Sequence, residues 1–181
     1  MVRNFRSLPN IITMTRLFLV PVMVAMVTGG RWAEAFAVFV VAGASDALDG
    51  WLAKTFGLQT ELGAYLDPVA DKTLLVSIYV ALGVSGAVPP WLAVLVVFRD
   101  IMIVGAILIS WLLNKPVRIA PVFVSKVNTA AQIAFAAAVL AAKAFGWSHG
   151  WAYDAAVLAV AALTLASAGA YLGPWIKHMG L

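Results

Sequence analysis

The sequence predicts an all-α integral membrane protein with six transmembrane helices. Of its 181 residues, 64% are hydrophobic and only 11% are charged, and the mean hydropathy is +0.98. Ordinary soluble domains have about a quarter of their residues charged. Apolar runs of about 20 residues, enough for a helix to cross a bilayer, recur along the chain. No alternating pattern typical of membrane β-strands appears, and an open sheet cannot cross lipid. These observations exclude a water-soluble globule, a disordered chain and a nucleic-acid-binding module.

The predicted spans are bounded by residues that interrupt or anchor helices. They cover approximately residues 11–27, 32–47, 69–88, 91–113, 121–145 and 151–172. The first ends at Gly29-Gly30, the third at Pro89-Pro90, and the fourth before Asn114-Lys115-Pro116, all of which disfavour a continued helix. The second span begins after Arg31, and the sixth begins at Trp151, a residue type enriched at membrane interfaces. The fifth span carries alanines at helical spacing, which allow close packing against another helix.

Charge predicts the orientation of these spans. Residues 1–10 are expected to form an interfacial segment, and six spans place both termini on the same side. That side would carry nine basic residues, against Arg31 and Lys143 on the other, and the basic side is expected to be cytoplasmic. The nine are Arg3, Arg6, Arg16, Lys54, Lys72, Lys115, Arg118, Lys126 and Lys177. No signal peptide is recognisable, so we expect the N-terminus to be mature as written and the chain, a single domain, to lie in a bacterial inner membrane.

Acidic residues are concentrated in one segment. Five of the eight Asp and Glu residues lie between Asp46 and Asp71, inside or beside apolar runs where carboxylates are costly. Asp46 and Asp49 are three residues apart and share a helical face, and Asp67 and Asp71 share a stripe with Thr60 and Gly63 on the next helix. These residues are Asp46, Asp49, Thr60, Gly63, Asp67 and Asp71.

Two facing helices would therefore present four carboxylates to a shared space. Like charges repel unless cations neutralise them. Oxygen ligands without Cys or a nearby His favour Mg²⁺ or Mn²⁺ over zinc. In the alternative interpretation, Asp67-Pro68 is a helix cap, or Asp46 and Asp49 simply pair with Lys54 and Lys72. Neither alternative explains why both acidic pairs align. A divalent-cation transporter remains a further alternative, although such sites usually lie at the midplane between repeats.

The segment resembles the signature of the CDP-alcohol phosphatidyltransferase family, D-x2-D-G-x2-A-R-x8-G-x3-D-x3-D. Every spacing is kept, and one position departs, because Lys54 replaces the arginine and loses its bidentate fork. The resemblance implies that the four Asp residues bind two divalent cations and that Asp71 is the general base. The matching positions are Asp46, Asp49, Gly50, Ala53, Lys54, Gly63, Asp67 and Asp71.

The resemblance extends to the start of the first span and implies a nucleotide site. Pro9 to Arg16 resembles the family's PN-x2-T-x2-R opening, although a helix cap with an interfacial arginine is the alternative. The family's CDP-binding positions correspond to Asn10, Thr13, Gly50, Lys54, Thr60 and Gly63. The family also implies a homodimer.

The acceptor alcohol is predicted from two further segments. Phe98–Met102 and Pro121–Ala130 resemble the CMP-forming cardiolipin synthases of this family. This implies CDP-diacylglycerol as donor and phosphatidylglycerol as acceptor, with glycerol 3-phosphate as the alternative acceptor. Arg99, Arg118 and Lys126 are candidates to bind the acceptor phosphate. Alternatively, Arg99 and Asp100 form an intramembrane ion pair.

Overall fold

The computed structural model describes a bundle of six α-helices. It describes residues 8–56, 61–113, 123–148 and 150–179, apart from the side chains of residues 8–10, 47, 49–54, 56 and 61–68. The helices are α1 (Leu8–Thr28), α2 (Trp32–Phe56), α3 (Glu61–Val84), α4 (Pro90–Leu112), α5 (Phe123–Phe145) and α6 (Trp151–Met179). The described part of the chain contains no strand. The predicted all-α class is therefore confirmed.

Four helices are long and apolar enough to cross a membrane. The qualifying stretches are Ile11–Thr28, Pro90–Leu112, Phe123–Phe145 and Trp151–His178. The chain is thus an integral membrane protein by helix length and composition. Among the described residues these four stretches qualify, and six transmembrane crossings stay a prediction.

The acidic segment is more helical than the hydropathy pattern predicts. The second helix continues nine residues past the predicted limit at residue 47, and the third begins at Glu61 rather than near residue 69. Asp67 therefore lies inside α3, so the interpretation of Asp67-Pro68 as a helix cap is wrong. Hydropathy detects only the apolar part of a helix, whereas backbone hydrogen bonding continues through polar turns.

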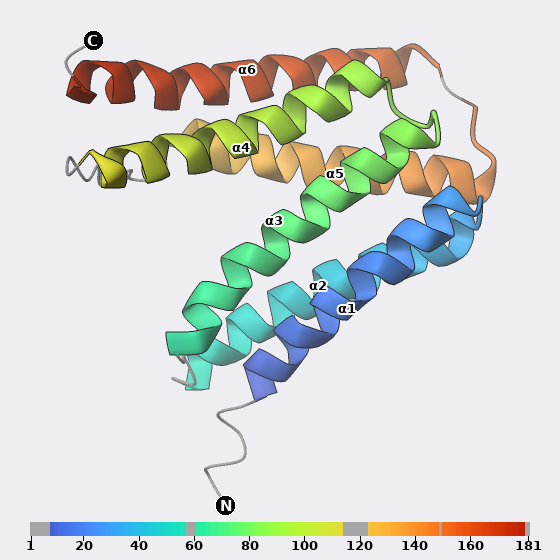
Figure 1. The fold of residues 1–181 in the computed structure, drawn as a ribbon. Helices are drawn as coiled ribbons and strands as arrows, with labels where there is room; N and C mark the ends of the chain where they lie inside the picture. The colour runs from blue at the N-terminus through green and yellow to red at the C-terminus, as the bar shows by residue number, and fades with distance from the viewer. Residues whose placement is uncertain (1–7, 57–60, 114–122, 149, 180–181) are drawn as a thin grey trace, which may run out of the picture.

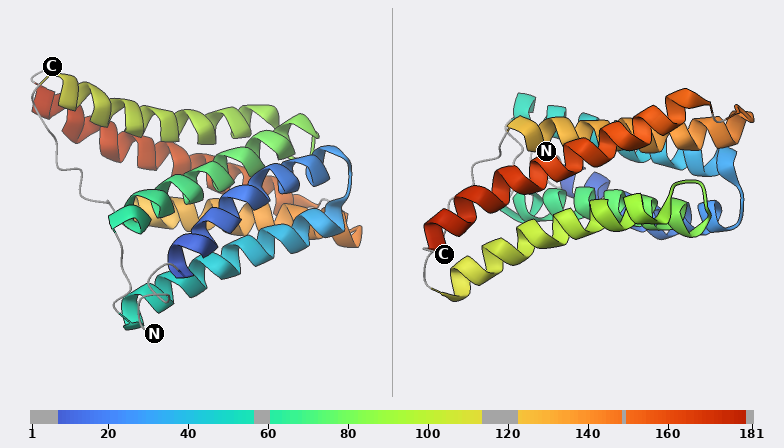
Figure 2. Two further views of the ribbon diagram at one scale, coloured as in Figure 1. Left: turned by 60° about the horizontal axis from the view of Figure 1, so that its bottom comes forward. Right: turned by 90° about the horizontal axis from the view of Figure 1, so that it is seen from above.

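The helices form a closed ring. The neighbours in the ring are α1·α2, α2·α5, α5·α6, α6·α4, α4·α3 and α3·α1, and α3 also contacts α5 across it. The short connections after α1, α3 and α5 gather at one end of the bundle, while α1, α2 and α3 diverge from α4 and α6 towards the other (Figures 1 and 2). The end of α2 and the beginning of α3 are both at this second end (Figures 1 and 2).

Glycine determines where α3 ends. Gly86 has φ of +70°, and the N–H of Ala87 donates to the carbonyl of Leu82 at 2.9 Å, which is the Schellman arrangement that closes a helix. The third helix therefore stops at Val84, before the predicted limit at residue 88. Gly30 after α1 and Gly146 after α5 adopt the same left-handed conformation.

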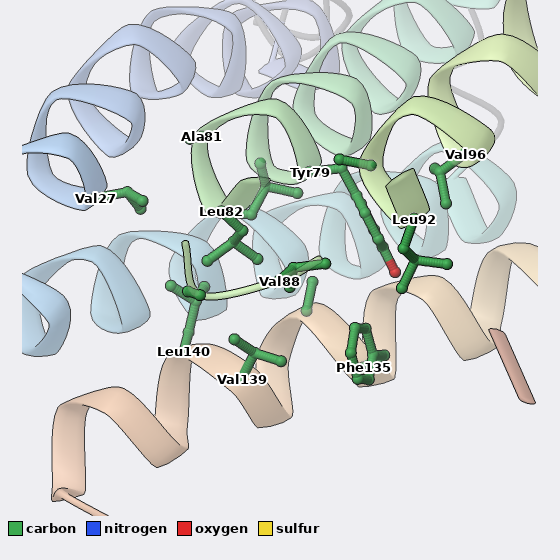
Figure 3. Close-up of a cluster of buried hydrophobic side chains, with 14 of the residues drawn as sticks. Val27, Tyr79, Ala81, Leu82, Val88, Leu92, Val96, Phe135, Val139 and Leu140 are labelled. Carbon is green, nitrogen blue, oxygen red and sulfur yellow. The ribbon is translucent and has the colours of Figure 1, made fainter. Parts of the chain in front are cut away.

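The apolar core lies between α3, α4 and α5, with α1 and α2 packed on one side. In Figure 3, side chains from α3, α4 and α5 converge, and the Tyr79 ring points from α3 towards α5. Its hydroxyl donates to the carbonyl of Gln132 at 3.1 Å, which satisfies a phenol in a buried position. The core members labelled there are Val27, Tyr79, Ala81, Leu82, Val88, Leu92, Val96, Phe135, Val139 and Leu140.

Candidate active site

Three helices bring two acidic side chains onto one arginine. Arg16 of α1 donates from Nη1 to Oδ1 of Asp71 on α3 at 2.5 Å, and the same nitrogen lies 2.5 Å from Oδ1 of Asp46 on α2. The Arg16 side chain is fully buried, whereas those of Asp46 and Asp71 are 45% and 52% exposed. The cation thus lies behind the two carboxylates, which keep an open side.

The open side of these carboxylates faces a cavity of about 410 Å³ between α2, α3 and α5. Its polar residues are Asp46, Asp71, Lys72 and Thr129, and its other lining residues are Phe39, Gly43, Leu74, Leu75 and Ile133. Along α2 and α3 the charged residues lie nearer the end of the bundle where α2 ends and α3 begins. The cavity is therefore charged towards this end and apolar towards the core, as an amphiphilic ligand requires.

A second charged cluster adjoins the cavity. Lys72 extends from α3 to Asp100 of α4, with Nζ 2.6 Å from Oδ1. The same Asp100 oxygen accepts a hydrogen bond from Arg99 Nη1 at 2.6 Å. Arg99 also donates to Ser125 of α5 and Ser167 of α6. The cluster thus connects α3, α4, α5 and α6.

The predicted site residues are only partly described. Asp46 and Asp71 meet on Arg16, and Thr13 is buried in α1. Six others lie within described helices, but their side chains are outside the description, namely Asn10, Asp49, Gly50, Lys54, Gly63 and Asp67. Thr60 and Arg118 lie outside the described residues.

The candidates for acceptor binding differ in position. Arg99 is 2% exposed and forms an ion pair with Asp100. This is the intramembrane ion pair that the sequence offered as the alternative to acceptor binding by Arg99. Lys126 is exposed on α5, three residues before Thr129 and seven before Ile133, both of which line the cavity. Its spacing places it on the same helical face as these two residues.

Sequence reasoning assigned no site role to Arg16, Lys72 or Asp100. Arg16 belongs to an apolar run, where a charged residue is costly and usually functional. The same argument applies to Asp100. Lys72 directly follows the proposed base Asp71. The sequence thus marked these three residues as unusual, and the fold shows that Arg16 contacts Asp46 and Asp71 and that Lys72 contacts Asp100.

The described donors suit a hard divalent cation. The carboxylates of Asp46 and Asp71, from two helices, both contact Arg16 on their buried side and are about half exposed on the other, where they line the cavity. Mg²⁺ and Mn²⁺ prefer such oxygen donors. Asp49 lies one turn beyond Asp46 along α2, and Asp67 one turn before Asp71 along α3. The four positions are thus compatible with the predicted ligand set.

Comparison with known proteins identifies the family. The family model described as CDP-alcohol phosphatidyltransferase matches residues 6–168. The chain belongs to the CDP-alcohol phosphatidyltransferase family. The match includes the helices that carry Arg16, Asp46 and Asp71, and members of this family generally depend on divalent cations. The family assignment supports an enzyme over the cation transporter considered from the sequence.

Relatives within this family differ in their acceptor. The chain is 33% identical to a CMP-forming cardiolipin synthase of Rattus norvegicus, covering 91% of this chain and 60% of the relative. It is 34% identical to a chloroplastic CDP-diacylglycerol–glycerol-3-phosphate 3-phosphatidyltransferase of Oryza sativa, covering 93% and 56%. It is 41% identical to a probable phosphatidylglycerophosphate synthase of Mycobacterium tuberculosis, covering 52% and 48%. The chain thus spans about half or somewhat more of each relative's length.

Proposed function

We propose that this phosphatidyltransferase moves a phosphatidyl group from CDP-diacylglycerol to phosphatidylglycerol and produces cardiolipin and CMP. The observation that carries the proposal is the meeting of Asp46 and Asp71 at the charged end of a cavity that is otherwise mainly apolar. A reaction between two lipids requires such a site, because the phosphate groups react while the acyl chains stay in an apolar environment. The similarity to the cardiolipin synthase of Rattus norvegicus supports this acceptor.

The proposed chemistry assigns separate roles to the carboxylates. Asp46, Asp49, Asp67 and Asp71 would hold two divalent cations, Mg²⁺ or Mn²⁺. When bound, such cations neutralise charge on a diphosphate. Asp71 takes the proton of the acceptor hydroxyl. The hydroxyl oxygen then forms a bond to the phosphorus that carries diacylglycerol, the phosphoanhydride bond breaks, and CMP leaves with the electron pair.

The nucleotide of the donor would be bound next to these carboxylates. We assign this role to Asn10, Thr13, Gly50, Lys54, Thr60 and Gly63, the positions that match the family's CDP-binding residues. Thr13 precedes Arg16 by one helical turn on α1, and Arg16 contacts both acidic residues, which supports a role for this helix in the site. Lys54 keeps a positive charge for the diphosphate, although a lysine cannot form the bidentate contacts of an arginine.

Glycerol 3-phosphate is the second candidate acceptor. The relatives from Oryza sativa and Mycobacterium tuberculosis have names that specify transfer to glycerol 3-phosphate or synthesis of phosphatidylglycerophosphate. Their similarity to this chain is comparable to that of the cardiolipin synthase. Both reactions use the same donor and the same carboxylates, so they differ only in the pocket for the acceptor.

One assay distinguishes the two acceptors. The purified protein is incubated with CDP-diacylglycerol, Mg²⁺ and either phosphatidylglycerol or glycerol 3-phosphate, and the lipid product is identified by mass. We expect cardiolipin with the first acceptor and CMP release that requires the divalent cation. Phosphatidylglycerophosphate as the only product would reject phosphatidylglycerol as acceptor, and no CMP release with either would reject the reaction.

Loss of the proposed base provides a second test. Asp71→Asn should reduce turnover by at least about 100-fold, because general-base catalysis contributes factors of that size. Binding of CDP-diacylglycerol, measured by its effect on thermal unfolding, should be largely retained. Turnover close to that of the wild type would reject Asp71 as the base.

A further inference from the structure

The salt bridge between Lys72 and Asp100 gives the cavity a fixed positive charge. The side chain of Lys72 is 45% exposed and lines the cavity, whereas that of Asp100 is only 6% exposed. Asp100 in turn accepts a hydrogen bond from Arg99, which is buried and also donates to Ser125 and Ser167. The position of the Lys72 ammonium is therefore set by a buried network rather than by solvent.

The charges of this network do not cancel. Arg99 and Lys72 contribute two positive charges and Asp100 one negative charge, which leaves an excess of one positive charge. The Arg99 guanidinium is directed at Asp100, Ser125 and Ser167 and is also 5.7 Å from the ring of Tyr171. Lys72 is the member of the network that reaches the cavity. A lysine ammonium has three N–H donors, and Asp100 accepts one of them.

A phosphate that enters this cavity meets the Lys72 ammonium. Asp46 and Asp71 line the same cavity, and Lys72 provides a positive charge that is separate from the cations these carboxylates would hold. Lys72 and Asp71 line the same cavity, so a phosphate bound by Lys72 shares this cavity with the proposed base. Both candidate acceptors carry a phosphate close to the hydroxyl that reacts, a phosphodiester in phosphatidylglycerol and a phosphomonoester in glycerol 3-phosphate.

We propose that Lys72 binds the phosphate of the acceptor and that Asp100 positions Lys72 for this contact. The inference rests on the proposed phosphatidyl transfer. It places acceptor recognition on α3 and α4, in addition to the candidates Arg118 and Lys126 inferred from the sequence. Lys72 is a binding residue in this scheme, and Asp100 is a positioning residue that acts through it.

The test compares KM for the acceptor with KM for the donor. In Lys72→Met the acceptor KM should rise about tenfold to 100-fold, the effect of losing a charge-assisted hydrogen bond, while the KM for CDP-diacylglycerol changes less than about twofold. Lys72→Arg should recover most of the acceptor affinity. Asp100→Asn should raise the acceptor KM by a smaller factor, because Lys72 keeps its charge but loses the salt bridge that fixes its position. Lys177→Gln, which removes an exposed lysine near the end of α6, is the matched control.

Binding measured without turnover separates this inference from the proposed function. Glycerol 3-phosphate or short-chain phosphatidylglycerol should raise the unfolding temperature of the wild type and of Lys177→Gln, but not that of Lys72→Met. Product formation with an unchanged acceptor KM in Lys72→Met overturns the role of Lys72 alone. An equal rise in the KM for donor and acceptor also overturns it. Acceptor binding that depends on Lys72 without any product overturns the proposed reaction and leaves the phosphate contact supported.

Discussion

At the scale of single residues, Arg16 determines the electrostatics of the acidic pair. A fully buried guanidinium bonded to Asp46 and Asp71 offsets the repulsion between two carboxylates from different helices. Hydrogen bonds to charged groups contribute more than neutral ones, and a buried donor without its acceptors is costly. Arg16 therefore stabilises the packing of α1 against α2 and α3 at the end of the bundle that carries the site.

Replacement of Arg16 should destabilise the protein in a cation-dependent way. Arg16→Gln is expected to lose about 1.5–3 kcal/mol of unfolding free energy, the contribution of a charge-assisted hydrogen bond. Mg²⁺ should recover part of this loss if the carboxylates bind it, because a bound cation replaces the missing charge. Thermal unfolding in detergent with and without Mg²⁺ measures both effects.

The control for this variant is Arg31→Gln. Arg31 forms an exposed ion pair with Glu34 at the other end of the bundle, and such pairs contribute little to stability. The unfolding temperature of Arg31→Gln should be close to that of the wild type and should not depend on Mg²⁺. Equal destabilisation of the two variants would contradict a special role for Arg16.

At the scale of the helices, the left-handed glycines set the ends of the elements. The three helices that run towards the end with the short connections each finish near a glycine with φ close to +70°. Residues with a side chain adopt this conformation at a cost of roughly 1–2 kcal/mol. These glycines therefore fix where α1, α3 and α5 stop and where the next helix begins.

Gly86→Ala should lower the unfolding free energy by about 1 kcal/mol because alanine is strained in the left-handed region. Gly105→Ala is a matched control, since an added Cβ meets open space at both positions and Gly105 lies inside the helix α4. There alanine is the better helix former by about 1 kcal/mol. The two variants should shift the unfolding temperature in opposite directions, and a shift in the same direction would contradict the role of the backbone conformation.

The prediction of elements from the sequence succeeded where the residue pattern is local. Gly29-Gly30 directly follows the end of α1 at Thr28, and Pro90 is the first residue of α4. The extension of α2 to Phe56 and the start of α3 at Glu61 were missed, because the polar residues there lower the hydropathy without ending the helix. The acids were predicted to lie on helices, and the backbone at Asp46, Asp49, Asp67 and Asp71 is helical, whereas the alignment of all four carboxylates stays a prediction.

At the scale of the whole molecule, the ring of helices brings the described charged groups of the site, Arg16, Asp46, Asp71 and Lys72, together around one cavity. The acidic pair comes from α2 and α3 and is joined by Arg16 of α1, and the cavity is completed by Thr129 and Ile133 of α5. The core labelled in Figure 3 comes mainly from α3, α4 and α5, and its α3 residues lie near the end of that helix at Val84. We propose that the charged end faces the cytoplasm and that two copies assemble as a homodimer, as the family resemblance implies.

Cysteine labelling tests this orientation. The sequence contains no cysteine, so single substitutions at exposed residues provide unique labels. Thr55→Cys, near the end of α2, should react with a membrane-impermeant thiol reagent only when the cytoplasmic face is accessible. Ser148→Cys, in the connection between α5 and α6, should react from the outer face. The reverse pattern would contradict the predicted orientation.

The sequence by itself determined the all-helical membrane class and the spacing of the acidic motif. Both depend on properties that a single helix carries, namely its apolar length and its period. The tertiary structure alone decided that Arg16 bridges Asp46 and Asp71, that Lys72 pairs with Asp100, and that α5 completes the cavity. These contacts depend on how each helix is rotated and which helix lies beside it. A chain that is apolar on nearly every helical face specifies neither of these in its hydropathy pattern.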